Sequence, residues 1–237
     1  MSSKASSEIV FTGGATSRTL VVRRHARART MRLMVDPRDG TVRLTLPPRA
    51  ALKPALAWAE EKRDWVEAAL AKIAPAEAIA HGETIMFEGA KLTIDWGRTH
   101  PRTPCVDAHR LILGGPQEAV AARVARWLRR EALARLTEDS RAMAARAGVT
   151  LGRVSIGDPK ARWGSCASSG DIRYSWRLIM APPHVREAVV AHEVAHRVHM
   201  NHAPAFHGLV AELLGREPVA ERAWLRANGA ALHRVGG

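Results

Sequence analysis

The sequence has little of what secreted and membrane proteins depend on. Only two of its 237 residues are cysteines, Cys105 and Cys166, and they lie far apart in the chain. A framework of disulfides is therefore not expected. No run approaches the roughly 18 apolar residues of a membrane helix, and residues 1–17 lack the apolar core of a secretory signal. These absences predict a cytoplasmic protein without membrane association, with residues 1–17 as a flexible tail.

Acidic residues are also scarce relative to basic ones. The chain has 36 Lys and Arg against 23 Asp and Glu, a formal net charge of +13. A field of this sign favours non-specific nucleic-acid binding through the basic surface. The charge is spread along the whole chain, however, which equally fits a simple abundance of arginine. We interpret Arg123, Arg126, Arg129 and Arg130 as a solvated helix face rather than a binding stripe.

The apolar pattern predicts an α+β protein, since strands and helices follow one another in blocks. Strands are expected over 19–24, 30–36, 41–46, 83–96 with a turn at Glu88–Gly89, 110–113, 149–157 and 171–179. Helices are expected over 50–73, 117–147, from Pro182–Pro183 onward, 203–214 and 217–232. The sequence thus suggests a β-rich N-terminal region with one helix, 18–115, followed by a second domain, 116–237.

One motif in the second domain points to chemistry. Residues 192–196 read His-Glu-Val-Ala-His, within an apolar segment of helical period. Two histidines four residues apart share one helix face and can bind one zinc ion. Glu193 lies beside that face, where it can take a proton from a zinc-bound water. The motif predicts a zinc hydrolase with His192 and His196 as ligands and Glu193 as the catalytic base.

A catalytic zinc site requires a third protein ligand, and three histidines are candidates. His199 would lie about 10 Å along the helix axis from His192, too far for all three rings to reach one ion. His202 suits if the helix ends at Met200–Asn201 and the chain folds back. Its six-residue spacing from His196 equals that of the metzincin pattern. We favour His202, while His207 on the next helix stays an alternative.

Four motifs together resemble a known family: RWGSC at 162–166, GDIRYSWRLIMAPPHV at 170–185, HEVAH at 192–196 and NHAPAF at 201–206. They are similar to the YgjP-like family of zinc metallopeptidases, which in turn resembles the SprT-like and Wss1-like proteases. The resemblance implies a zincin-like catalytic unit in 116–237, a small antiparallel sheet over an active-site helix. It also implies His202 as the third ligand. The chain departs from the family at Ser175, Ala203 and His207, where asparagine, serine and tryptophan are usual.

The resulting hypothesis is a zinc-dependent metallopeptidase, an endopeptidase, acting on a peptide or protein whose backbone pairs with a strand edge near 171–177. Two other functions stay open: a zinc hydrolase of nucleotide phosphoanhydrides, and a nucleic-acid-associated module with a structural zinc. The oligomeric state is not predicted.

Three further residues near the motif have open roles. Arg162, or a backbone N–H beside it, could stabilise an oxyanion, although a packing turn around Trp163 is an equal alternative. Tyr174 could polarise a substrate carbonyl. We interpret Cys166 as a small buried residue rather than a ligand. Gly164 is expected to permit a close approach of the backbone.

Overall fold

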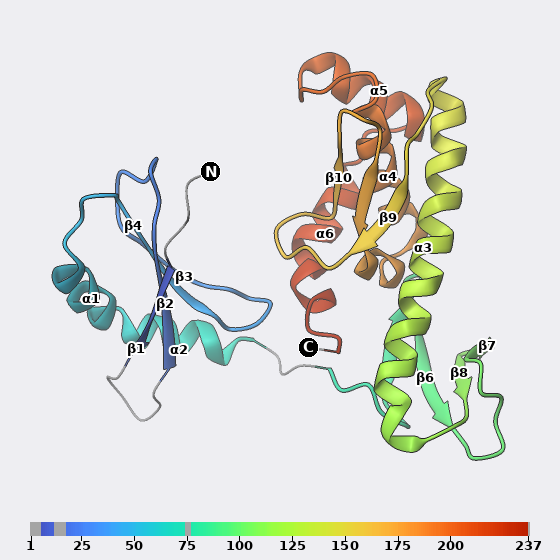
Figure 1. Cartoon of the computed structure of the whole chain (residues 1–237), viewed down its shortest axis with the longest axis horizontal. Coiled ribbons are helices and arrows are strands. Elements are labelled where there is room, and N and C mark those ends of the chain that lie inside the picture. Colours follow the sequence, from blue (N-terminus) through green and yellow to red (C-terminus); the bar gives the residue numbers. More distant parts are fainter. Residues whose placement is uncertain (1–5, 12–17, 74–76, 237) are drawn as a thin grey trace. The chain divides into compact units, whose positions relative to one another are not determined.

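The computed structural model describes residues 6–11, 18–73 and 77–236 and divides the chain into two compact units, Met1–Ala76 and Glu77–Gly237 (Figure 1). The division falls after residue 76, whereas the sequence pattern predicted it after residue 115. The physical reason is the core of the second unit, which includes Ile85, Ile94 and Leu111. The strands between 84 and 113 therefore fold with the histidine motif rather than with the N-terminal strands.

The first unit is a four-stranded sheet with two helices. Its strand order is β1-β2-β4-β3, with β2 parallel to β4 and the other pairs antiparallel. The strands are β1 (Ser6–Phe11), β2 (Arg18–Arg24), β3 (Arg32–Val35) and β4 (Val42–Leu46). Alternate residues of β2 and β4, such as Leu20 and Leu44, are fully buried against the helices. The prediction of a flexible tail over 1–17 is wrong for residues 6–11, which form strand β1. Residues 1–5 and 12–17 lie outside the described residues.

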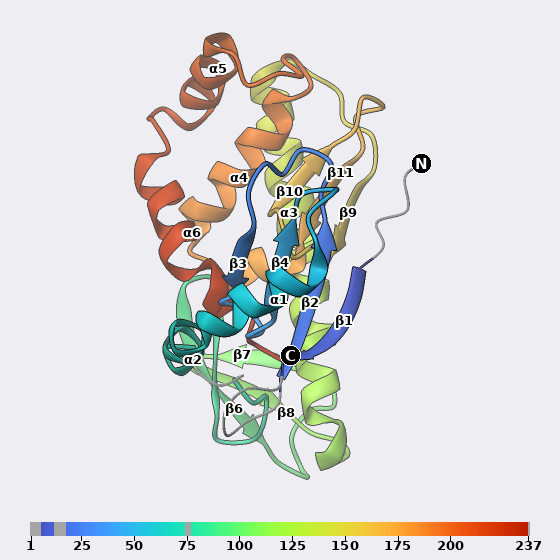
Figure 2. The same ribbon diagram turned by 90° about the vertical axis from the view of Figure 1, so that its left-hand side faces the viewer.

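The helix predicted over 50–73 is two helices, α1 (Leu52–Glu61) and α2 (Arg63–Ala71), which meet at Lys62. Helix α1 lies across the strands and buries Ala55 and Ala59 (Figure 2). Helix α2 buries Val66 in the same core.

The second unit begins with another four-stranded sheet, in the order β5-β6-β8-β7. Its strands are β5 (Thr84–Phe87), β6 (Ala90–Trp96), β7 (Cys105–Asp107) and β8 (Arg110–Leu113). The predicted turn at Glu88–Gly89 is confirmed, and both residues have positive φ, 48° and 80°. A 3-10 turn, η1 (Gln117–Ala119), leads into the predicted long helix α3 (Val120–Ala147), which ends at Gly148 with φ 65°.

A three-stranded sheet and three helices complete the second unit. The sheet contains β9 (Val154–Gly157), β10 (Gly164–Cys166) and β11 (Ile172–Ser175), in the order β10-β11-β9. It is mixed rather than antiparallel as expected, because β11 runs parallel to β9. The predicted strand 171–179 ends at Ser175 and continues as a buried 3-10 helix, η2 (Trp176–Met180). Helices α4 (Pro183–Ala195), α5 (Pro204–Leu214) and α6 (Val219–Leu232) follow as predicted. The fold class is thus α+β, as the sequence indicated.

Two buried arginines, neither singled out in the sequence, tie these elements together. Arg177 donates to the carbonyl oxygens of Leu232 and Val235 and forms an ion pair with Asp158. Arg186 on α4 lies between Asp139 of α3 and Glu88 of the β5–β6 turn. Such buried charges are tolerated only when they are paired, so these contacts fix helix α4 and the C-terminal segment.

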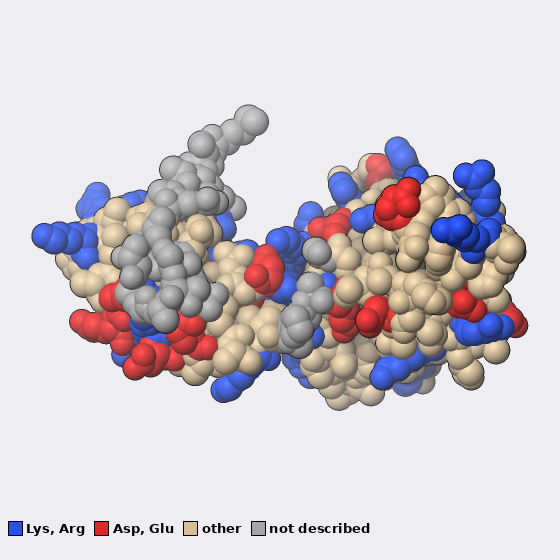
Figure 3. Space-filling view, turned by 90° about the horizontal axis from the view of Figure 1, so that it is seen from below, with Lys and Arg blue, Asp and Glu red and all other residues tan. Residues whose placement is uncertain are grey.

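Basic side chains are scattered over the face of both units drawn in Figure 3 rather than forming one continuous band. This distribution agrees with the even spread of charge in the sequence. Among the described residues, no helix is both long and apolar enough to cross a membrane.

Candidate metal centre

The histidine motif lies at the C-terminal end of α4. Pro183 occupies the first turn of this helix, and most of the following side chains are buried. Helix α4 ends with His196 as its C-cap residue, and the N–H of His199 still bonds the carbonyl of Ala195. The helix thus ends before Met200–Asn201, where its end was predicted, because the chain leaves the helical conformation after His196. The chain then folds back through Met200–Asn201 and places His202 just before α5.

The structure brings His192, His196 and His202 together. One ring nitrogen from each lies within 4.8 Å of the other two, and Nε2 of His202 is 3.2 Å from Nε2 of His192. Phe206 packs against all three rings, with centroid distances of 4.9, 4.6 and 4.8 Å. The phenyl ring therefore packs against the three imidazoles together and restricts their orientation.

The donor set fits a metal ion. Nδ1 of His196 lies 3.1 Å from the carbonyl oxygen of His199; a hydrogen bond there directs the proton to Nδ1 and leaves Nε2 free for a metal. Burial, with a smaller contribution from the neighbouring histidines, lowers the pKa of His192 to about 4. Burial also lowers the pKa of His196. Neutral imidazoles with converging nitrogens can hold a divalent transition metal.

The other two candidate ligands do not join this group. His199 contributes its backbone carbonyl to His196 rather than its ring. The His207 ring lies 6.3 Å from that of His202, on the exposed side of α5, and is outside the cluster of converging nitrogens. The cluster contains three residues, and His202 is exposed, so a bound ion would have an open side.

Glu193 lies beside the histidines and is buried against strand β10. A Cβ atom on Gly164 would lie 2.5 Å from its Oε1, so the glutamate can occupy this place only because residue 164 has no side chain. The close approach expected at Gly164 is confirmed, and the group that approaches is the glutamate. Burial raises the pKa of Glu193 to about 7, while the charge of Arg162 and the backbone N–H of Cys166 act in the opposite direction. A carboxyl poised near neutrality suits proton transfer.

Two other candidates are not part of the histidine cluster. Tyr174 is completely buried, and its hydroxyl is 3.0 Å from Oγ of Ser140 on α3, so it cannot reach a substrate. Cys166 is half-buried, and burial raises the pKa of its thiol, which fits the inert residue that we expected.

The strand edge beside Glu193 is that of β10 rather than 171–177. Strand β11 has β10 on one side and β9 on the other, so its own backbone groups are used within the sheet. Strand β10 has no neighbour on its other side among the described residues. The N–H of Ser175 bonds Trp163 and the N–H of Ala167 bonds Asp171, which leaves the backbone of Gly164 facing the free edge.

Sequence reasoning missed two contributions to this centre. Phe206 follows His202 by four residues, a spacing that could have suggested a packing contact. The carbonyl of His199 carries no signal in the sequence, because any residue there would supply it.

Comparison with known proteins gives one match. No curated protein and no solved structure matches the chain. The family model described as the YgjP-like metallopeptidase domain matches residues 29–228, which include the histidine cluster, Glu193 and strand β10. The match covers most of both units. The chain therefore belongs to the YgjP-like metallopeptidase domain family.

Proposed function

We propose that this protein is a zinc-dependent metallopeptidase in which His192, His196 and His202 hold the metal and Glu193 is the general base. The observation that carries the proposal is the convergence of three imidazole nitrogens within 4.8 Å of one another. Beside them, the buried carboxyl of Glu193 packs on β10, a strand at the edge of its sheet. Zinc held there would act as a Lewis acid on a substrate carbonyl and on a coordinated water.

Glu193 would move the proton. With its pKa raised to about 7, mainly by burial, the carboxyl can accept a proton at neutral pH and deliver it to the leaving amine. A cation on the neighbouring imidazoles would lower this pKa and favour the proton-accepting form. Arg162 lies near enough to influence Glu193 and would stabilise negative charge that develops on the substrate.

The substrate would bind as an extended peptide. The backbone of Gly164 faces the free edge of β10, and an added strand would pair there. This pairing would bring the peptide next to the Glu193 carboxyl, which rests on Gly164. A structural zinc site is normally closed by four protein ligands, so the three-residue cluster with an exposed His202 favours a catalytic role over a structural one.

Glu193→Gln tests the proposal. The substitution keeps the size of the side chain but removes the base, so we expect cleavage of an unfolded protein such as casein to fall by at least about 100-fold. Zinc content and thermal unfolding should stay as in the wild type. The matched control is Glu187→Gln on the same helix, which lies outside the cluster and should leave cleavage unchanged.

Two results would contradict the proposal. Full cleavage by Glu193→Gln would remove the glutamate from catalysis. Hydrolysis of nucleotide phosphoanhydrides without any cleavage of peptides would make the protein a different hydrolase on the same centre.

A further inference from the structure

The first turns of α3 lie at the opposite end of the second unit from α5 (Figure 1). A groove of about 420 Å³ lies there. Its walls combine four arginines with an apolar base, and they are formed by Arg102, Thr103, Pro104, Arg123, Arg126, Trp127 and Arg130. The groove thus lies between the loop 97–104 and one face of α3.

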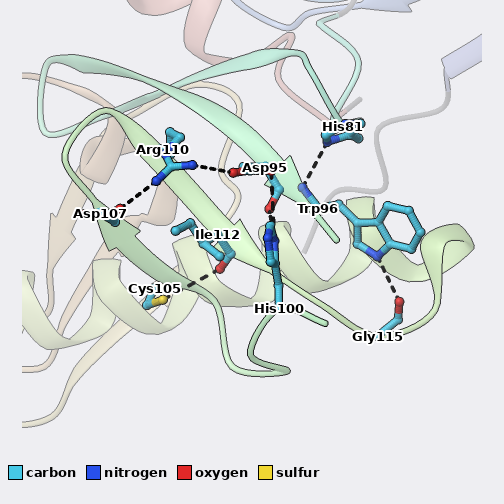
Figure 4. Close-up of polar contacts among 9 residues, drawn as sticks. All are labelled: His81, Asp95, Trp96, His100, Cys105, Asp107, Arg110, Ile112 and Gly115. Carbon is cyan, nitrogen blue, oxygen red and sulfur yellow. Dashed lines mark hydrogen bonds and ion pairs between the residues drawn. The ribbon is translucent and has the colours of Figure 1, made fainter. Parts of the chain in front are cut away.

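The loop is attached firmly to the end of β8. The N–H of Gly97 bonds the carbonyl of Leu113, and the N–H of Gly114 bonds the carbonyl of Pro101 at 2.7 Å. The indole of Trp96 donates to the carbonyl of Gly115 at 2.9 Å (Figure 4). These contacts fix the backbone position of Arg102 and keep the loop beside α3.

The guanidinium group of Arg123 packs against the backbone of Gly115. Gly115 has φ +92°, and a Cβ atom at this position would lie 2.2 Å from Nη1 of Arg123. The guanidinium group therefore lies against the backbone of the turn. Arg123 is half-buried and lines the groove, so this side chain is held in position before any ligand binds.

The positive charge of the groove is balanced only in part by acidic side chains of the described residues. Among the described residues, Arg130 pairs with Glu131 at 3.0 Å, whereas no acidic side chain lines the groove. Arg123, Arg126 and Arg130 are three and four residues apart, so like charges adjoin on one helix face. Arg123 also lies in the first turn of α3, near the positive end of the helix dipole, where a cation is unfavourable. A bound anion would reduce the repulsion among these three side chains.

The shape and composition of the groove indicate which anion fits. Arginine guanidinium groups bind phosphate oxygens in pairs. The row from Arg123 to Arg130 extends about 10 Å along the helix, which is enough for more than one phosphate. Trp127 is 4% exposed and cannot stack on a base. Only the backbone of a nucleic acid would therefore be contacted, independently of its sequence.

We propose that this groove binds phosphate groups of a nucleic-acid backbone, at a site separate from the histidine cluster. This replaces the interpretation of the same arginines as a solvated face. Arg129, the fourth arginine of that stretch, has a different role, because its guanidinium packs over Trp176 at 4.9 Å.

The test compares two double variants by fluorescence anisotropy of a short labelled DNA duplex over a range of salt concentrations. Arg123→Gln/Arg126→Gln removes two charges from the groove. We expect affinity to fall on the order of 10-fold and the log–log salt slope to decrease by about 2. The matched control is Arg141→Gln/Arg146→Gln, which removes two exposed charges near the other end of α3 and should change affinity less than about 2-fold.

A third variant is the control for a folding defect in Arg123→Gln/Arg126→Gln. Arg102→Gln/Arg126→Gln changes two exposed side chains, so it should fold normally and still lose affinity. Equal losses in the groove and control variants would overturn the proposal, since net charge alone would then explain binding. Unchanged affinity in both groove variants would overturn it as well.

Competition with other anions identifies the source of the phosphate. Displacement of the duplex by a second, unlabelled nucleic acid, but not by polyglutamate, is the expected result. Equal displacement by polyglutamate would mean that the groove takes acidic peptides. Saturation of the groove by ATP or pyrophosphate, with duplex binding unaffected by the arginine substitutions, would assign it to small phosphate compounds. Either of these results would overturn the proposal.

Discussion

At the scale of single residues, the geometry of the candidate metal centre depends on a few contacts, each of which positions particular side chains. Phe206 holds the three imidazole rings, the carbonyl of His199 orients His196, and Gly164 leaves room for the Glu193 carboxyl. Each contact acts on the orientation of a side chain rather than on the chemistry itself. Outer contacts of this kind commonly change metal affinity or activity by about 10- to 100-fold.

The choice of the third ligand can be measured directly. His202→Ala removes one of three converging nitrogens, so zinc affinity should fall by more than about 100-fold. His207→Ala should retain one zinc per chain, since that ring lies 6.3 Å from His202 and outside the cluster. Elemental analysis of the purified variants distinguishes the two. Loss of zinc on changing His207, with zinc retained on changing His202, would reverse the assignment.

Gly164 offers a test of the position of the base. In Gly164→Ala the new Cβ would lie 2.5 Å from Oε1 of Glu193, so the carboxyl must move. A displacement of about 1 Å can cost on the order of 100-fold in rate, and we expect that loss in peptide cleavage with zinc content unchanged. The control is Gly208→Ala on α5, where no atom lies within 4 Å of an added Cβ. Normal cleavage by Gly164→Ala would show that Glu193 does not need this position.

At the scale of elements, the turn between β3 and β4 is fixed by one buried carboxylate. The side chain of Asp36 is 1% exposed and accepts hydrogen bonds from the backbone and the guanidinium of Arg38. Arg43 of β4 lies 3.2 Å from the same carboxylate. The hydrogen bond from Arg38 is the main reason that the pKa of Asp36 is held below its ordinary value, although burial and Asp39 act against it.

This carboxylate should make the stability of the turn depend on pH. Because the pKa of Asp36 is lower in the folded state, its contribution is fully present above the unfolded pKa of about 3.9 and is lost as the pH falls through the folded value. Asp36→Asn should therefore cost about 1–3 kcal/mol at pH 7 and clearly less near pH 3. Hydrogen exchange of the β3 and β4 amides measures both.

The control for this pH effect is Glu61→Gln, an exposed carboxylate in the same unit, with an expected change within about 0.5 kcal/mol. A cost of Asp36→Asn that stays constant from pH 7 to pH 3 would show that the ionised carboxylate does not fix the turn.

Local pattern is what made many elements predictable. Alternation in β2 and β4, the Gly148 stop of α3 and the proline at the start of α4 are signals within a few residues. The histidine motif is equally local, since one helix turn brings His192 and His196 together. By contrast, the partners of Arg177 lie 55 and 58 residues away in sequence, and the parallel pairing of β9 with β11 leaves no local mark. Such contacts follow from tertiary packing and could not be read from spacing.

At the scale of the whole molecule, each unit has its own hydrophobic core. Among the described residues, one core contains residues from 9 to 70 and the other contains residues from 79 to 235. The second unit is closed by its own ends, since Glu77 bridges to Val235. All three histidines, Glu193 and strand β10 lie in this unit. A chain with a separate core and closed ends has what it needs to fold alone.

We therefore predict that residues 77–237 alone fold cooperatively and bind one zinc ion with the affinity of the full chain. The matched control is residues 116–237, which begin at the boundary drawn from the sequence. That shorter chain lacks Ile85, Leu92, Ile94 and Leu111, all at most 2% exposed in the core. Losing four such side chains removes roughly 6–12 kcal/mol of apolar burial, as much as the whole stability of a typical domain. Thermal unfolding with zinc analysis compares the two chains. Folding of 116–237 with normal zinc content would restore the boundary at 115, whereas failure of 77–237 to fold would make the first unit part of the catalytic domain.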